Sequence, residues 1–180
     1  MKRCALVSLI LFSVTICFSQ VYLTKNGNIK LSSDTPLETI RAVNKDVEAA
    51  VDLKNRNIAF SLPLKSFVFT KSLMQEHFNE NYVESDKYPR STFSGSFGET
   101  VPKGQDGSFP VKVKGKLTLH GVTRDVEIPG TFVRKGNVLT GTANFKLNPT
   151  DYKIRIPFIV REKIEKETSI EVNIVLNQKQ

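Results

Sequence analysis

Apolar and polar residues alternate along most of this chain, and that alternation constrains its fold more than any other feature. A period of two is typical of a β-strand with one buried face and one exposed face. At least eight segments show it, at residues 29–31, 47–53, 58–64, 93–97, 111–119, 126–132, 139–147 and 170–176. The chain is therefore predicted to be all-β.

Turn-forming residues separate several of these segments, at residues 25–28, 54–57 and 134–137. Asn and Gly in such short gaps favour hairpins, so neighbouring strands are expected to be antiparallel. A sheet with one apolar face has to fold over or close on itself to bury that face. We predict one domain built from an antiparallel sheet of about eight strands.

Two segments depart from the alternation. In residues 71–83, Met74, His77 and Phe78 have helical spacing, which predicts a short helix at one end of the sheet. Residues 157–166 are expected to form either a second short helix or an irregular excursion.

The N-terminus has the features of a secretory signal peptide. Lys2 and Arg3 precede an apolar run over residues 5–18, and small residues after it suit cleavage before Gln20. The apolar run is too short for a typical membrane span. We therefore predict an exported protein, with a buried N-terminal strand or helix as the alternative.

This interpretation divides the chain into a signal peptide, residues 1–19, and a domain, residues 20–180. Both cysteines, Cys4 and Cys17, lie in the leader, so the exported domain would have no disulfide, thiol nucleophile or thiolate metal site. Export without disulfides fits a bacterial envelope, and we expect a periplasmic or secreted protein. A lipoprotein signal at Cys17 is an alternative, disfavoured by the bulky Ile16 before it.

The formal net charge is +8, and loss of Lys2 and Arg3 with the leader would lower it to +6. Basic residues are interspersed with acidic ones, as over residues 161–167, and no basic run of five or more occurs. This pattern is typical of a solvated surface rather than of a nucleic-acid site. Transient attraction to anionic membrane surfaces is compatible with it.

Few residues suited to catalysis are present. The chain has only two histidines, His77 and His120, and it has no nucleophile elbow, zinc motif or phosphate-binding glycine loop. We expect no enzyme activity, cofactor or metal, and we keep a hydrolase as the minor alternative.

The stretch around His120 lies between two alternating segments. Gly121 can adopt a positive φ, the Thr123 hydroxyl can bond a local backbone amide, and Arg124 can pair with a carboxylate on the neighbouring strand. We interpret this stretch as a hairpin with a structural histidine, with a catalytic histidine as the alternative. For His77 the options are a satisfied polar contact or a cap on the polar end of a ligand.

The expected inward face mixes large residues with small ones, namely Ala49, Gly95, Gly130, Gly141 and Ala143. Small residues can pair with phenylalanines across a filled core, or they can leave a tube. A barrel of about eight strands is wide enough for one small ligand. The alternation alone leaves both arrangements open.

Four motifs along the chain carry a family resemblance. They are F-S-L-P-L-K-S-F-V-F, L-M-Q-E-H-F-N-E-N-Y, K-Y-P-R-S-T-F-S-G and G-K-L-T-L-H-G-V-T-R-D-V-E-I. In this order they resemble the YceI-like family of bacterial envelope proteins, most clearly over residues 60–133. The chain departs from the family at residues 151–153, where a phenylalanine-glycine pair is common. The resemblance implies a lipocalin-like antiparallel barrel that holds a long isoprenoid chain or similar amphiphile in its lumen.

The resulting prediction is a non-catalytic carrier for a polyisoprenoid or other long-chain amphiphilic lipid. The expected ligand-binding residues lie on the inward faces of strands and on the helix: Phe60, Leu62, Phe67, Phe69, Met74, His77, Phe78, Phe93, Phe97, Leu117, Leu119, Phe132, Phe145 and Val172. The alternative is a ligand-free structural or protein-interaction barrel of the cell envelope, with its lumen packed solid. The identity of the ligand and the oligomeric state, a homodimer included, stay open.

Overall fold

The computed structural model describes residues 20–34, 39–155 and 167–179. The predicted signal peptide, residues 1–19, and the segment 157–166 lie outside these described residues. Within the described ranges, no helix is long and apolar enough to cross a membrane.

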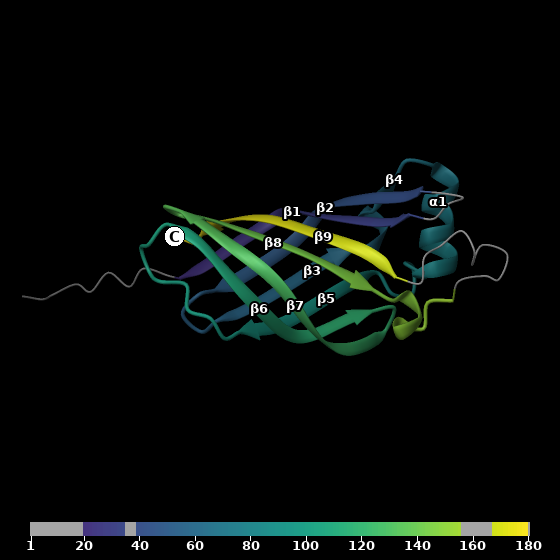
Figure 1. Ribbon diagram of the computed structural model, residues 1–180. Coiled ribbons are helices and arrows are strands. Elements are labelled where there is room, and N and C mark those ends of the chain that lie inside the picture. The colour runs from purple at the N-terminus through teal and green to yellow at the C-terminus, as the bar shows by residue number, and fades with distance from the viewer. Residues whose placement is uncertain (1–19, 35–38, 156–166, 180) are drawn as a thin grey trace, which may run out of the picture.

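The strands form one closed antiparallel barrel (Figure 1). They are β1 (Val21–Asp34), β2 (Thr39–Asp52), β3 (Asn57–Pro63), β4 (Val68–Phe69), β5 (Arg90–Phe97), β6 (Gly107–Leu119), β7 (Val122–Lys135), β8 (Val138–Leu147) and β9 (Thr168–Gln178). Their order is β1-β9-β8-β7-β6-β5-β3-β2-β4, and an additional pairing of β1 with β2 closes the barrel. The short β4 pairs with β2 outside this ring of eight. The predicted eight-stranded antiparallel barrel is confirmed.

A short helical segment covers one end of the barrel (Figure 1). Helix α1 spans Ser72–His77 and continues into a π-helical turn, η2, at Phe78–Tyr82. The helix predicted within residues 71–83 is therefore confirmed. Two 3-10 turns complete the described elements, η1 at Leu64–Ser66 and η3 at Pro149–Tyr152.

Two of the three predicted turns join antiparallel strands as expected. In the β2–β3 turn, the Asp52 carboxylate accepts hydrogen bonds from the backbone amides of Lys54 and Asn55, at 2.9 and 3.0 Å. In the β7–β8 turn, Gly136 has a φ of 56°. Side-chain capping and a left-handed residue therefore set these two turns.

The turn predicted at residues 25–28 is wrong, because this stretch is a bulge inside β1. The register of β1 against β2 shifts on both sides of Gly27. A Cβ at Gly27 would lie 2.8 Å from Ile174 Cγ2, so the glycine permits a close approach of the wall to the core. Turn-forming residues also mark bulges, which is why the sequence pattern was misread.

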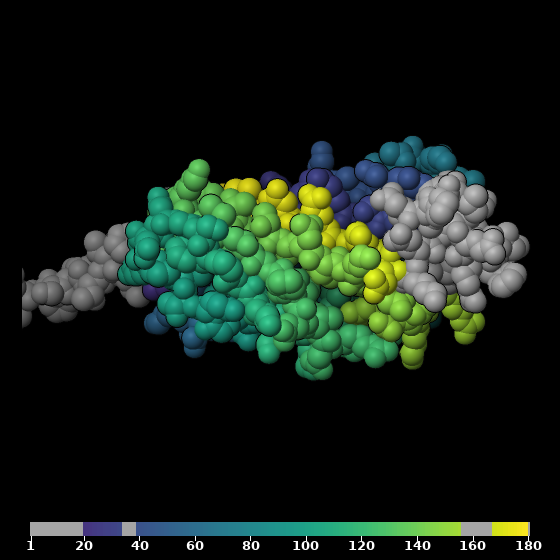
Figure 2. Space-filling model, in the orientation of Figure 1, coloured from purple at the N-terminus to yellow at the C-terminus, as the bar shows by residue number. Residues whose placement is uncertain are grey.

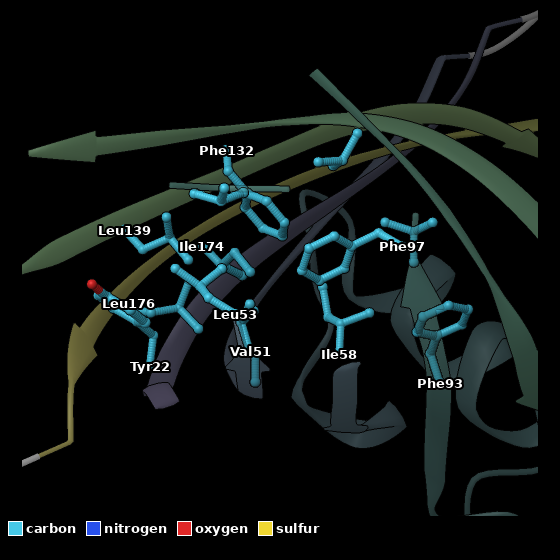
Figure 3. Packing of buried hydrophobic residues seen from close by; sticks show 14 residues of the cluster. Tyr22, Val51, Leu53, Ile58, Phe93, Phe97, Phe132, Leu139, Ile174 and Leu176 are labelled. Atoms are coloured by element: carbon cyan, nitrogen blue, oxygen red, sulfur yellow. The ribbon is translucent and has the colours of Figure 1, made fainter. Parts of the chain in front are cut away.

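The end of the barrel away from α1 is packed solid by apolar side chains (Figure 3). Leu139, Leu176 and Val51 are fully buried there, and Tyr22 is 1% exposed. The rings of Phe97 and Phe132 meet edge to face, with centroids 5.4 Å apart. This packed end supplies most of the tightly buried core.

Charged side chains occupy the outward positions of the strands. On β6 and β7, Lys112 and Lys114 each lie 2.9 Å from the Glu127 carboxylate, and Lys116 lies 2.9 Å from Asp125. The neighbouring Lys112, and then Lys114, hold the pKa of Glu127 below its usual value. In the space-filling view, side chains of β6 to β9 cover this face of the barrel (Figure 2). Pairing across strands fixes their register more than it stabilises the fold.

Candidate functional site

A cavity of about 320 Å³ occupies the half of the barrel nearer α1. Large side chains of the strands and the helical segment surround it, with small residues of β7 and β8 among them. Its lining includes Ile29, Leu31, Ser33, Ile40, Ile58, Phe60, Leu62, Leu64, Phe67, Phe69, Met74, His77, Phe78, Tyr82, Val83, Ser91, Phe93, Val111, Val113, Leu117, Leu119, Ile128, Gly130, Phe132, Gly141, Ala143, Phe145, Leu147, Ile154, Thr168, Ile170, Val172 and Ile174. The lumen is thus packed in one half and open in the other.

Aromatic side chains position the helical segment over the cavity. The Phe78 ring lies 5.5 Å from that of Phe67 and 5.0 Å from that of Phe69, between centroids. The Gln75 side chain accepts a hydrogen bond from the Phe69 amide at 3.3 Å. No residue of α1 itself is buried. The segment is therefore held mainly by Phe78 and its aromatic neighbours.

The floor of the cavity is formed where the packed end begins. Phe60 and Phe93 meet edge to face at 6.3 Å, and Phe132 borders both the cavity and the packed end. Gly95 and Gly115 face each other beneath the Phe93 ring, whose Cζ would lie 2.7 Å from a Cβ at either glycine. Their missing side chains let this ring lie flat across two strands.

Apart from His77, the polar side chains that line the cavity carry hydroxyl groups. Ser33, Ser91 and Thr168 are buried, and the Ser91 hydroxyl donates to the Thr118 carbonyl at 2.9 Å. Burial raises the pKa of the Tyr82 phenol, which stays neutral at physiological pH. Among the lining residues that the structure describes, none is Lys, Arg, Asp or Glu.

All of the predicted lining residues except Phe97 border this cavity. Phe97 lies on the same face of β5 as Phe93, but at the packed end, against Phe132. Sequence reasoning missed other lining residues. Ile29 and Ile170 lie in alternating segments, and Tyr82 follows Phe78 at helical spacing, so these three could have been found. Ile154 lies in an irregular segment without periodicity.

The predicted hairpin around His120 is confirmed, with different partners from those expected. His120 and Gly121 form the two-residue turn between β6 and β7, with φ of 51° and 70°. The Thr123 hydroxyl lies 2.8 Å from the Thr118 hydroxyl, not on a backbone amide. Arg124 Nε donates to the Asp151 carbonyl at 3.0 Å, rather than to a carboxylate on the neighbouring strand. Through Arg124 and His120, the hairpin therefore contacts η3.

Groups for metal or acid–base chemistry do not gather in the cavity. Across the described ranges, no three His, Cys, Asp or Glu side chains are placed to hold a metal ion. His77, on α1, borders the cavity. His120 is not among the lining residues, and its ring contacts Glu84 and the Tyr152 carbonyl. The two histidines do not form a common site. The arrangement is suited to enclosing an apolar chain.

Comparison with known proteins supports the same fold. A structure of a polyisoprenoid binding domain from Saccharophagus degradans implicated in plant cell wall breakdown matches with a TM-score of 0.75 and 11% identity, covering 89% of this chain and 99% of that one. BcnA from Burkholderia cenocepacia matches with a TM-score of 0.70 and 16% identity, over 83% of this chain and 95% of that one. The YCEI protein of Campylobacter jejuni has a TM-score of 0.56 and 16% identity, with full coverage of both chains.

A search among curated proteins finds no match to this chain. The model of the YceI-like domain, in contrast, matches residues 23–176, which begin within β1 and end within β9. This match includes every strand of the barrel and the helical segment over the cavity. The chain is therefore a member of the YceI-like family.

Proposed function

We propose that this protein is a non-catalytic carrier that holds the chain of a polyisoprenoid or similar long amphiphile in the open half of its barrel. The single observation that carries the proposal is the apolar cavity of about 320 Å³, which a closed eight-stranded wall and a helical segment enclose. The similarity in fold to a polyisoprenoid binding domain supports it.

Burial of an alkyl or isoprenoid chain supplies enough free energy for useful affinity. Each buried methylene contributes about 0.8 kcal/mol, so roughly ten of them contribute about 8 kcal/mol. That gain corresponds to a Kd in the micromolar range before the entropic cost of association is subtracted. The preformed cavity wall keeps the ordering part of that cost low. A chain of at least this length is therefore the natural occupant.

The polar groups of the cavity favour a ligand with an uncharged head group. The buried hydroxyl of Thr168 on β9 borders the cavity and can exchange hydrogen bonds with a hydroxyl or carbonyl of the ligand. A phosphate or carboxylate would meet no Lys or Arg among the described lining residues. An isoprenoid alcohol should therefore bind more tightly than its pyrophosphate.

The site of loading is proposed to be a membrane surface. Val68 of β4 and Leu73 of α1 are 64% and 60% exposed, and both lie at the end of the barrel that the helical segment covers. Exposed apolar side chains beside a lipid cavity suit brief contact with acyl chains. Together with the predicted signal peptide, this placement supports action in the periplasm or after secretion.

Native mass spectrometry of gently purified protein tests the carrier function. We expect a mass increment from a copurified amphiphile, and its replacement by geranylgeraniol on addition. Displacement of the neutral fluorophore N-phenyl-1-naphthylamine by geranylgeraniol, compared with geranylgeranyl pyrophosphate, tests the head-group preference. Repeated recovery of empty protein that binds neither probe would instead support the ligand-free barrel module.

A further inference from the structure

Three segments of the cavity wall meet at one histidine outside the lumen. His120 Nε2 lies 2.6 Å from Glu84 Oε2, and Nδ1 lies 3.0 Å from the Tyr152 carbonyl oxygen. The His120 side chain is only 10% exposed, and its ring packs edge to face against Tyr88, with centroids 4.6 Å apart. We call this arrangement of His120, Glu84, Tyr88 and the Tyr152 carbonyl the histidine clasp.

Each segment of the clasp adjoins a residue that lines the cavity. Leu119 directly precedes the histidine, Val83 directly precedes the glutamate, and Ile154 follows η3 by two positions. The clasp thus joins the β6–β7 hairpin, the segment after η2 and the segment of η3. If it loosens, three adjoining parts of the cavity wall lose their common anchor.

Unusual backbone conformations gather at the same place. Among the described residues, the non-glycine residues with positive φ are Arg56, Glu84, His120 and Lys153, and the last three lie in the clasp or directly after it. Such conformations cost free energy and persist where surrounding contacts compensate. In a two-residue hairpin turn, Asn or Gly would be the favoured residue at the position of His120. The contacts of the imidazole are therefore what offset its backbone conformation.

Both polar neighbours of the imidazole are hydrogen-bond acceptors. A neutral imidazole has one N–H donor, whereas the protonated ring donates from both nitrogens. A carbonyl oxygen and an ionised carboxylate donate nothing, so both bonds form together only when the ring is protonated. The other charged or titratable side chains on the segments packed against the ring are Asp86, Lys87 and Tyr88 after η2, Asp151, Tyr152 and Lys153 around η3, and Arg124 on the hairpin itself.

We propose that protonated His120 is a positioning residue that keeps this part of the cavity wall closed, and that loss of its second ring proton loosens the wall and speeds ligand exchange. The ligand step rests on the carrier function proposed above. As pH rises through the range in which histidines change charge, about pH 5 to 8, one of the two bonds is lost. A bound chain is therefore retained in acid and exchanged faster in mildly alkaline solution.

The first test needs no ligand. Hydrogen exchange of the backbone amides in residues 84–88, corrected for the intrinsic effect of pH, is measured on the purified protein at about pH 5 and about pH 8. We expect a roughly tenfold loss of protection at the higher pH, the size expected for one charge-assisted hydrogen bond. In His120→Asn the turn is preserved, because Asn tolerates positive φ, but the side chain is too short to reach Glu84. Protection in that variant should be low at both pH values.

The second test measures the dissociation rate of N-phenyl-1-naphthylamine by stopped-flow fluorescence over the same range. Wild type should release the probe roughly tenfold faster at about pH 8 than at about pH 5. His120→Asn should release it fast at both, and Glu84→Gln should show a weaker dependence on pH. His77→Gln controls for the only other histidine of the chain. Because His77 borders the cavity, this variant is compared with wild type by hydrogen exchange in residues 84–88 and not by probe release.

Wild-type pH dependence of protection and release in His120→Asn would overturn the proposal. Loss of the pH dependence of protection in His77→Gln would overturn it as well. If the wild type binds no probe at all, the carrier function fails, and hydrogen exchange in residues 84–88 still decides whether the clasp responds to pH. The two hypotheses are therefore separable.

Discussion

Replacement of Ala143 by phenylalanine tests whether the open half of the lumen is the binding site. Ala143 lines the cavity of about 320 Å³ from β8. A phenyl ring there takes space that roughly four to six methylenes of a ligand would otherwise fill. At about 0.8 kcal/mol for each methylene, binding weakens by about 3–5 kcal/mol, or about two to four orders of magnitude in Kd.

The stability of the protein is expected to behave differently from its affinity. Burying a phenylalanine side chain contributes about 1.5–3 kcal/mol, and overpacking a filled core costs about 1–3 kcal/mol. Because Ala143 faces open space rather than a filled core, the free energy of unfolding should stay within about 1 kcal/mol of wild type or rise. Urea unfolding of wild type and of Ala143→Phe measures this difference in the free energy of unfolding.

Ala59→Phe is the matched control, since Ala59 lies on the exposed face of β3. Titration with N-phenyl-1-naphthylamine should give a wild-type Kd for this variant. A folded Ala143→Phe protein with wild-type affinity would refute the placement of the ligand in the lumen. An equal loss of affinity in both variants would show that the added ring acts elsewhere.

Three further changes test the walls around the cavity. Phe132→Ala removes the ring that packs 5.4 Å from Phe97, and urea unfolding should show a loss of about 3–5 kcal/mol; a loss below 1 kcal/mol would contradict a packed floor. Gly95→Ala places a Cβ 2.4 Å from a backbone carbonyl oxygen of β6, so we expect little soluble protein, and a folded variant by circular dichroism would show that the strands can separate. Val68→Ser combined with Leu73→Ser should slow probe uptake from anionic vesicles severalfold and leave Kd in solution unchanged, whereas unchanged uptake would argue against membrane loading.

Much of the fold was predictable because it depends on local periodicity. Alternation assigns each strand residue to the inner or outer face, and a closed barrel then brings all inner faces to one lumen. Phe60, Leu117 and Val172 were assigned to the lining in this way, and all three border the cavity. Closure itself depends on the pairing of the first strand, β1, with the last, β9, and local periodicity gives no signal for a pairing between such distant segments.

The position of a residue along the barrel axis was not predictable from alternation. Phe93 and Phe97 share one face of β5, yet one borders the cavity and the other lies in the packed end. Which of them meets open space depends on side chains across the lumen, such as Phe132. Those neighbours come from distant strands, and the positions of strand residues along the barrel axis depend on register shifts such as the bulge at Gly27. The sequence could therefore indicate a lining but not where the cavity ends.

The contacts of His120 were unpredictable for a related reason. Its partners Glu84 and Tyr152 lie 36 and 32 residues away in the chain, on segments without regular periodicity. The sequence correctly indicated a hairpin, because the turn is local. It could not indicate that the imidazole would be enclosed by two remote segments.

A barrel that is packed at one end and open at the other has to stabilise its two halves differently. At the packed end, buried side chains such as Leu139 and Leu176 contribute through close contact across the lumen. At the open end a second cluster of buried side chains, Val47, Leu64 and Val83 among them, packs around the cavity instead of filling the lumen. The aromatic contacts of Phe78 and the hydrogen bonds of His120 add to this cluster at the same end. In the proposed carrier, ligand exchange would therefore disturb only the cluster around the cavity, while the packed end keeps the barrel folded.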